Sequence, residues 1–136
     1  MYGDTAAGRK RVAQLREQGG DVRALAARLV SQAEAVPWHG KAAESMRERI
    51  RERAGHLRAA AAQHDTAADS LAAHLIEVDR LKEAIDLRSR KATTLVEDAR
   101  TRTSEGTGDD ADAALVAFDP PPAGHRDWLT LDLPGL

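Results

Sequence analysis

Residues 36–40 read Val-Pro-Trp-His-Gly and lie where one segment with a heptad-like pattern stops and a longer one starts. Pro37 disfavours helical backbone in the residue before it, which helps to end a preceding helix. Gly40 has no Cβ, which suits a chain reversal, and we expect Trp38 to pack against both flanking helices as a large flat anchor. The stretch therefore predicts a tight turn between two helices, with Trp38, His39 and Gly40 as its turn motif.

The segment before the turn carries one apolar stripe at alternating steps of three and four residues, which predicts a helix over about residues 5–35. Its members are Val12, Leu15, Gly19, Val22, Ala26, Leu29, Ala33 and Val36. Gly19 and Gly20 weaken such a helix by about 1 kcal/mol each relative to Ala, and Asp21 would suit the cap of a new helix start. A break at the glycines stays open, but the unchanged phase of the stripe favours one continuous helix.

The segment after the turn carries two interleaved seven-residue series. One is Ile50, Leu57, His64, Leu71, Val78, Ile85, Ala92 and Ala99, and the other is Ala54, Ala61, Ala68, Leu75, Lys82, Ser89 and Val96. Together they predict a coiled-coil helix over about residues 41–102, roughly twice as long as the first helix. The first helix cannot cover all of it. We therefore expect a partner to bind the remaining apolar positions, namely Leu71, Leu75, Val78, Ile85 and Val96, and the protein not to be a stable monomer.

Composition changes after the long helix, so residues 1–103 are predicted to form the hairpin domain and residues 104–136 a flexible linker and proline-rich tail. A short helix is expected near residues 111–118. Apolar and polar residues then alternate, as in a strand-like peptide that lies on another surface. The candidate recognition residues of this tail are Trp128, Leu129, Leu131 and Leu133. Three interpretations stay open: an export signal, a strap that folds back onto the long helix, or an end without a role.

Composition argues against several functions. The net charge is only −2 although 31% of residues are charged, so no field of one sign would attract nucleic acid. The sequence has no cysteine, and His56, His64 and His74 lack the spacing of a metal site. It contains neither a glycine-rich phosphate loop nor an apolar run long enough to span a bilayer or to act as a signal peptide. We expect no enzymatic activity, no metal or cofactor, no nucleic-acid partner and no membrane span.

The region from Asp21 through the turn motif to Ile85 resembles the WXG family of small helical-hairpin proteins that type VII (ESX) secretion systems export. The resemblance lies in the Ala, Leu and Arg-rich segment before the turn, in Trp38-His39-Gly40, and in the run after it, Lys41-Ala42-Ala43-Glu44-Ser45-Met46-Arg47. It covers about half of the chain. It implies an antiparallel hairpin that dimerises into a four-helix bundle, with itself or with a related small helical protein, and that has no enzymatic activity. It also implies export from the cytoplasm to the cell surface or medium without a signal peptide, by a membrane ATPase that reads a C-terminal signal.

Two features depart from that family. Its usual export signal is a Tyr followed four residues later by Asp or Glu, whereas the only tyrosine here is Tyr2, with Ala6 at that spacing. The second departure is extra length, both in the long second helix and in residues 104–136. Two other interpretations therefore stay open: a cytoplasmic antiparallel coiled-coil scaffold or regulatory protein, and a targeting factor that docks a larger effector on the far half of the long helix.

Overall fold

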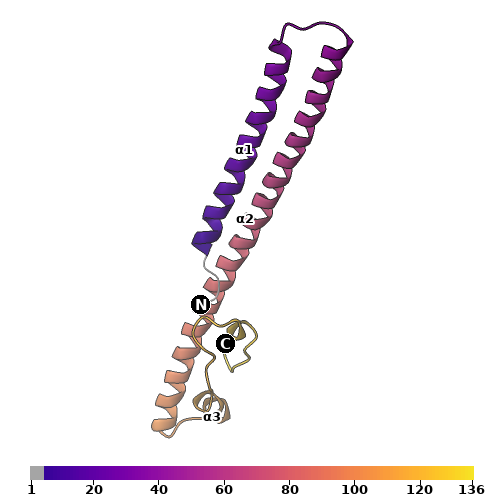
Figure 1. The fold of residues 1–136 in the computed structure, drawn as a ribbon. Coiled ribbons are helices and arrows are strands. Elements are labelled where there is room, and N and C mark those ends of the chain that lie inside the picture. Colours follow the sequence, from indigo (N-terminus) through magenta and orange to yellow (C-terminus); the bar gives the residue numbers. More distant parts are fainter. Residues whose placement is uncertain (1–4) are drawn as a thin grey trace. The chain divides into compact units, whose positions relative to one another are not determined.

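A computed structural model describes residues 5–136 of the chain, and these residues form an all-α structure. Helix α1 spans Thr5–Ala35, α2 spans Lys41–Ser104 and α3 spans Asp110–Val116, and a 3-10 helix, η1, spans Arg126–Leu129 (Figure 1). The chain divides into two compact units. The N-terminal unit is Ala6–Leu75, and the C-terminal unit is Ile76–Leu136 together with Thr5.

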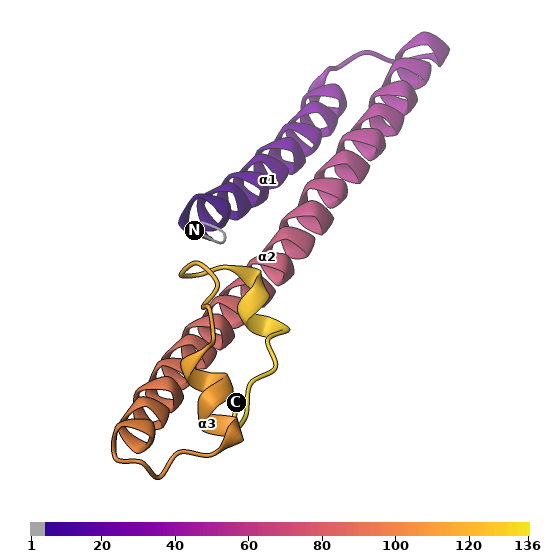
Figure 2. The same ribbon diagram turned by 90° about the horizontal axis from the view of Figure 1, so that it is seen from below.

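The N-terminal unit is an antiparallel hairpin in which α1 lies alongside the first part of α2 (Figures 1 and 2). The buried side chains between the two helices are mostly alanines, which let the backbones approach closely. They are Val12, Ala26 and Ala33 from α1 and Ala43, Ala54, Ala61, Ala68 and Leu75 from α2. Four of the α2 positions belong to one of the two predicted seven-residue series. The prediction of an all-α antiparallel helical hairpin is confirmed.

Helix α1 runs without a break through Gly19 and Gly20, as the unbroken stripe favoured. Gly19 lies where α1 approaches α2: a Cβ at this position would be 3.3 Å from the carbonyl oxygen of Ala61 and 3.1 Å from Oδ1 of Asp65. A Cβ at Gly20 would meet no atom within 4 Å. The first glycine therefore permits close helix packing, whereas nothing in the contacts of the second requires glycine.

Apart from Thr5, the C-terminal unit consists of the second part of α2 and the segment that follows it. Ile85, Ala92 and Ala99 are the buried α2 positions here, and they belong to the other seven-residue series. Trp128 packs on Ile85 and Ala92. The most deeply buried α2 positions thus come mainly from one series in the N-terminal unit and from the other series in the C-terminal unit. The division falls inside α2, whereas the composition placed the domain boundary at its end.

Residues 104–136 differ from the flexible linker and extended tail that we expected. Asp109 caps α3, because its side chain accepts a hydrogen bond from the backbone N–H of Asp112 (2.9 Å) while Asp112 Oδ2 accepts from the N–H of Asp109 (3.3 Å). The side chain of His125 caps η1 through a single hydrogen bond, in which its Nδ1 accepts from the backbone N–H of Asp127 (3.1 Å). Because Trp128 lies inside η1, the alternating residues begin in a 3-10 turn, and the strand-like interpretation of this position is wrong.

Within residues 5–136, no helix combines the length and the apolar character that a membrane span requires.

Candidate functional site

The turn between α1 and α2 is set by its glycine. Gly40 has φ 104°, a left-handed conformation that strains any residue with a Cβ. Its carbonyl oxygen accepts the hydrogen bond from the backbone N–H of Glu44 (3.1 Å), which starts α2. This conformation explains why a residue without a Cβ stands at the chain reversal.

Trp38 does not anchor the turn. Its side chain is 61% exposed, so the predicted packing of the ring against both helices is wrong. His39 is exposed as well. The contact that Trp38 makes with α2 runs through its backbone, because its carbonyl oxygen accepts a hydrogen bond from Nη2 of Arg47 (2.7 Å). The ring is left free of the hairpin core.

Arg47 fastens the turn in place of the indole. Its guanidinium also donates to the carbonyl oxygens of Val36 (2.7 Å) and Ala33 (3.2 Å) at the end of α1. The last carbonyls of a helix lack partners within it, and a cation beside them stabilises the negative end of the helix dipole. The last turn of α1 has no basic residue of its own. Arg47 was missed because it lies three residues after Glu44, a spacing typical of a surface ion pair.

Most of the predicted partner-binding residues are covered within the chain. Leu71 and Leu75 pack with Val12 and Leu15 in the hairpin. Ile85 is buried against Trp128 and the residues around it. Val78 and Val96 are half-buried. The expectation of an uncovered stripe counted only α1 as a cover and left out residues 104–136.

Trp128 is the centre of the contacts that hold the tail. Its side chain is 4% exposed, and its indole N–H donates to the carbonyl oxygen of Pro122 (3.1 Å). The ring of Phe118 meets it edge to face, with centroids 6.2 Å apart and planes at 70°. Leu129, Leu131 and Leu133 are partly buried in the same cluster. All four candidate tail residues therefore contact the cluster on α2.

Arg88 of α2 fixes the backbone of this tail. Its Nε donates to the carbonyl oxygen of Trp128 (2.6 Å), and its Nη2 donates to that of Leu131. The two carbonyls are three residues apart, so one guanidinium holds both the end of η1 and the chain that leaves it. The sequence contained no signal for this contact, since an arginine on a charged helix face resembles solvated surface.

A third arginine of α2 joins the end of that helix to α3. Arg102 donates through Nε and Nη2 to the two carboxylate oxygens of Asp112, at 2.9 and 2.7 Å. The Asp112 side chain is only 6% exposed. Hydrogen bonding to Arg102 lowers the pKa of Asp112 and raises the pKa of Arg102. The pair keeps α3 docked while the carboxyl group is ionised.

A pocket of about 190 Å³ lies beside Trp128 on α2. Its apolar walls come from both segments of the C-terminal unit, and its polar lining comes from α2. The lining residues are Ala92, Thr93, Val96, Glu97, Arg100, Phe118, Pro120 and Trp128. Two aromatic rings and a half-buried valine suit an apolar or aromatic group.

The C-terminal unit also exposes large apolar side chains on α2. Ile76 is 71% exposed and Leu87 is 65% exposed. They are eleven residues apart, close to three helical turns, so they lie on the same face of α2. We call Ile76 and Leu87 the outer apolar pair.

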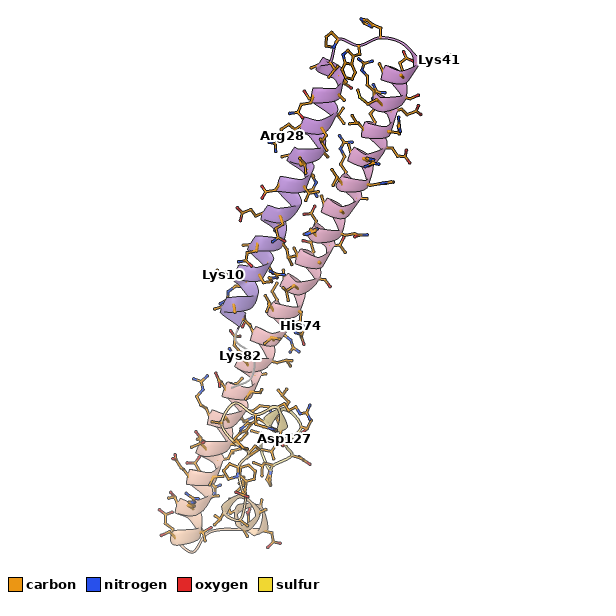
Figure 3. All side chains as sticks on the ribbon, in the orientation of Figure 1. Lys10, Arg28, Lys41, His74, Lys82 and Asp127 are labelled. Carbon is orange, nitrogen blue, oxygen red and sulfur yellow. The ribbon has the colours of Figure 1, made fainter. Side chains whose placement is uncertain are left out.

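The outer face of α1 is charged instead. Lys10 and Arg28, for example, lie on the side of α1 that points away from α2 (Figure 3).

Among the described residues, the groups with shifted pKa values belong to ion pairs that stabilise the structure. Shifted pKa values occur in two arginine–carboxylate pairs, Arg102–Asp112 and Arg80–Glu77. The pKa of Glu77 is lowered by its hydrogen bonds from Arg80, three residues along α2. Residues 5–136 contain no group of three or more His, Cys, Asp or Glu that could hold a metal ion. Features of the described residues that suit binding include the exposed Trp38, the outer apolar pair and the pocket beside Trp128.

No protein-family model matches this chain, and no curated protein or solved structure matches it either.

Proposed function

We propose that this chain is a non-enzymatic helical-hairpin protein that pairs with a partner protein and serves as a type VII secretion substrate or export partner. The observation that carries the proposal is the connection between α1 and α2. Two long helices pack antiparallel and are joined through Trp38-His39-Gly40, with Gly40 at φ 104°. This is the arrangement that the resemblance to the WXG family implies.

The outer apolar pair supports a role in binding a helix of another protein. Ile76 and Leu87 leave most of their apolar surface in water, which costs free energy that a partner would recover. Their spacing suits a helix laid along α2 rather than a small ligand. The partner is a second copy, a related small helical protein or a larger effector.

The titratable groups support a binding rather than a catalytic role. The carboxyl groups with shifted pKa values are held by arginines that join or stabilise helices. Neither faces the pocket beside Trp128, whose lining includes neither residue. Catalytic groups with perturbed pKa values normally line the cleft where substrate binds.

A secretion assay tests the proposal. The chain is produced in a bacterium with a type VII system, and its amount in the culture medium is compared between strains with an intact and an inactivated secretion ATPase. We expect export only with the intact ATPase, while a cytoplasmic enzyme stays in the cells of both strains. Equal amounts in both media, or none in either, would contradict the proposal.

The same assay tests the outer apolar pair. Replacing Ile76 and Leu87 together by Ser should reduce export without lowering thermal stability, because both side chains are exposed. Leu25→Ser is the matched control, since Leu25 is an exposed leucine of the N-terminal unit. Unchanged export of the double variant would remove the pair from partner binding.

The alternative is a cytoplasmic antiparallel coiled-coil scaffold or regulatory protein. The packing of Trp128 and its neighbours on α2 favours this candidate, because an export signal read by an ATPase must be accessible. A scaffold would remain in the cells of both strains and would co-purify with a defined partner that the Ile76 and Leu87 variant no longer binds.

A further inference from the structure

Two features of the chain complement each other. An indole ring projects from the hairpin turn, and a pocket with aromatic walls lies in the C-terminal unit. We propose that Trp38 of one copy of this chain inserts into the pocket beside Trp128 of a second copy. This self-association does not depend on secretion, and it uses neither Ile76 nor Leu87.

Trp38 is presented in a way that favours binding. Its ring is 61% exposed, yet its carbonyl oxygen is held by Arg47, and Pro37 restricts the backbone before it. A side chain on a backbone that is already ordered loses less conformational entropy when it is immobilised. Tryptophan also buries a large apolar area for two rotatable bonds, which is why it is enriched among residues that dominate binding energy.

The pocket has a suitable size and lining. An apolar cavity of about 150 Å³ can hold benzene, and this pocket of about 190 Å³ offers more room for the larger indole. Phe118 and Trp128 both line it and contact each other edge to face, and since Trp128 is only 4% exposed, we expect the ring of the partly exposed Phe118 to make the main aromatic contact with an incoming indole. Trp128 is held in place by two hydrogen bonds. Its indole N–H donates to the carbonyl oxygen of Pro122, and its own carbonyl oxygen accepts from Nε of Arg88.

The charges around ring and pocket are compatible with this contact. Lys41 follows the turn motif, and Glu97 on the rim of the pocket offers it a carboxylate of opposite sign. Arg100, also on the rim, is a cation that can lie over the face of the incoming indole. The indole of Trp38 thus suits Arg100, and the basic Lys41 that follows it suits Glu97.

The contact is heterologous, since ring and pocket are different parts of the chain. Each copy has one ring to give and one pocket to fill, so association can continue from copy to copy into a ring or an open chain. This property makes the proposal testable with two complementary variants. Trp38→Ala removes the ring but keeps the pocket, and Thr93→Phe fills the pocket from an exposed position but keeps the ring.

The experiment is sedimentation velocity of purified chains over a range of concentrations. Wild type should self-associate, and each variant alone should do so at least about tenfold more weakly, as for the loss of a dominant aromatic contact. A mixture of the two variants should form a one-to-one complex, because one supplies the ring and the other the pocket. The measurements are repeated with Ile76→Ser and Leu87→Ser present throughout, which leaves out association through the outer apolar pair.

The controls are neighbouring residues of the same exposure. His39→Ala changes the turn beside the ring, and Thr94→Phe adds a phenyl group to α2 outside the pocket. Thr93 and Thr94 each donate a side-chain hydrogen bond to the carbonyl oxygen four residues earlier, so their replacements disturb α2 alike. Both controls should associate like wild type. A monomeric wild type, a Trp38→Ala variant that associates normally, or a mixture that stays unassociated would overturn the proposal.

Discussion

At the scale of single residues, three arginines of α2 form hydrogen bonds with groups that lie outside α2. Arg47 binds carbonyls at the end of α1, Arg88 binds carbonyls of the tail, and Arg102 binds the carboxylate of Asp112. Each provides several donors in a planar fork, which one lysine cannot reproduce. A core built mainly from alanine gains little stability from burial per residue. The hydrogen bonds of these arginines therefore contribute a larger share of the stability here than they would in a protein with a thick core.

The two adjacent glycines of α1 make a matched pair for a stability prediction. Gly20→Ala should raise the free energy of unfolding by about 0.5–1 kcal/mol, because it restricts the unfolded chain and its Cβ meets open space. Gly19→Ala restricts the unfolded chain to the same extent, but it places a Cβ 3.3 Å from the backbone oxygen of Ala61. We expect it to be less stable than Gly20→Ala. Urea denaturation followed by circular dichroism measures the difference, and a Gly19 variant as stable as the Gly20 variant would show that the helices can separate without cost.

Backbone requirements could be read from single residues, whereas side-chain partners could not. Gly40 was predictable because a reversal before a helix start needs a residue without a Cβ. Trp38 was misjudged, because its place beside the turn says nothing about the direction in which the ring points. Arg47 contacts residues 9 to 14 positions earlier, and no spacing rule within one helix covers such contacts.

At the scale of elements, α2 has two partners that use different parts of its pattern. Helix α1 buries Ala54, Ala61 and Ala68, and the tail buries Ile85 and Ala92. The sequence shows both seven-residue series, but along most of the helix it does not show which one is covered. The end of α1 at Ala35 agrees with the predicted end near residue 35, because the apolar stripe and Pro37 mark it. The structure of the tail could not be predicted in the same way, because few of its residues belong to a repeating pattern.

The two tryptophans give a prediction at this scale. Trp128→Ala should destabilise the C-terminal unit by about 3–5 kcal/mol, the usual cost of deleting a fully buried aromatic side chain. Trp38→Ala should change the free energy of unfolding by less than about 0.5 kcal/mol, since its ring is exposed. Hydrogen exchange followed by mass spectrometry locates the effect. Faster exchange in residues 76–136 with unchanged exchange in residues 6–75 is expected for Trp128→Ala alone. Equal exchange in both variants would remove Trp128 as the anchor of the tail.

At the scale of the whole molecule, the two units differ in how their ion pairs are placed. In the hairpin, Arg16–Asp69 and Arg23–Asp65 join α1 to α2, but their side chains are largely exposed. Exposed pairs of this kind contribute about 0–1 kcal/mol each. In the C-terminal unit, the carboxylate of Asp112 is nearly inaccessible and receives two hydrogen bonds from Arg102. The composition showed many charges of both signs, but it did not show which of them is buried.

Acid should therefore loosen the C-terminal unit through Asp112. The pKa of this carboxyl group is lower in the folded state than its ordinary value of about 3.9, chiefly because of its hydrogen bonds from Arg102. A lowered pKa means that the folded state favours the ionised form, so the stabilisation is complete above the unfolded-state pKa. It is lost as the pH falls below about 4 and through the folded-state pKa.

Fluorescence of Trp128 in a Trp38→Phe background reports this transition without interference from the exposed indole. We expect the emission to shift as the pH is lowered from about 6 to about 2, because Asp112 is protonated and α3 and the tail leave α2. Asp112→Asn should be less stable near neutral pH and should lose most of the acid dependence. Asp110→Asn is the matched control, because it changes an exposed aspartate of the same helix and leaves Arg102 its partner. An acid transition in Asp112→Asn as large as that of the control would assign the pH dependence to other carboxyl groups.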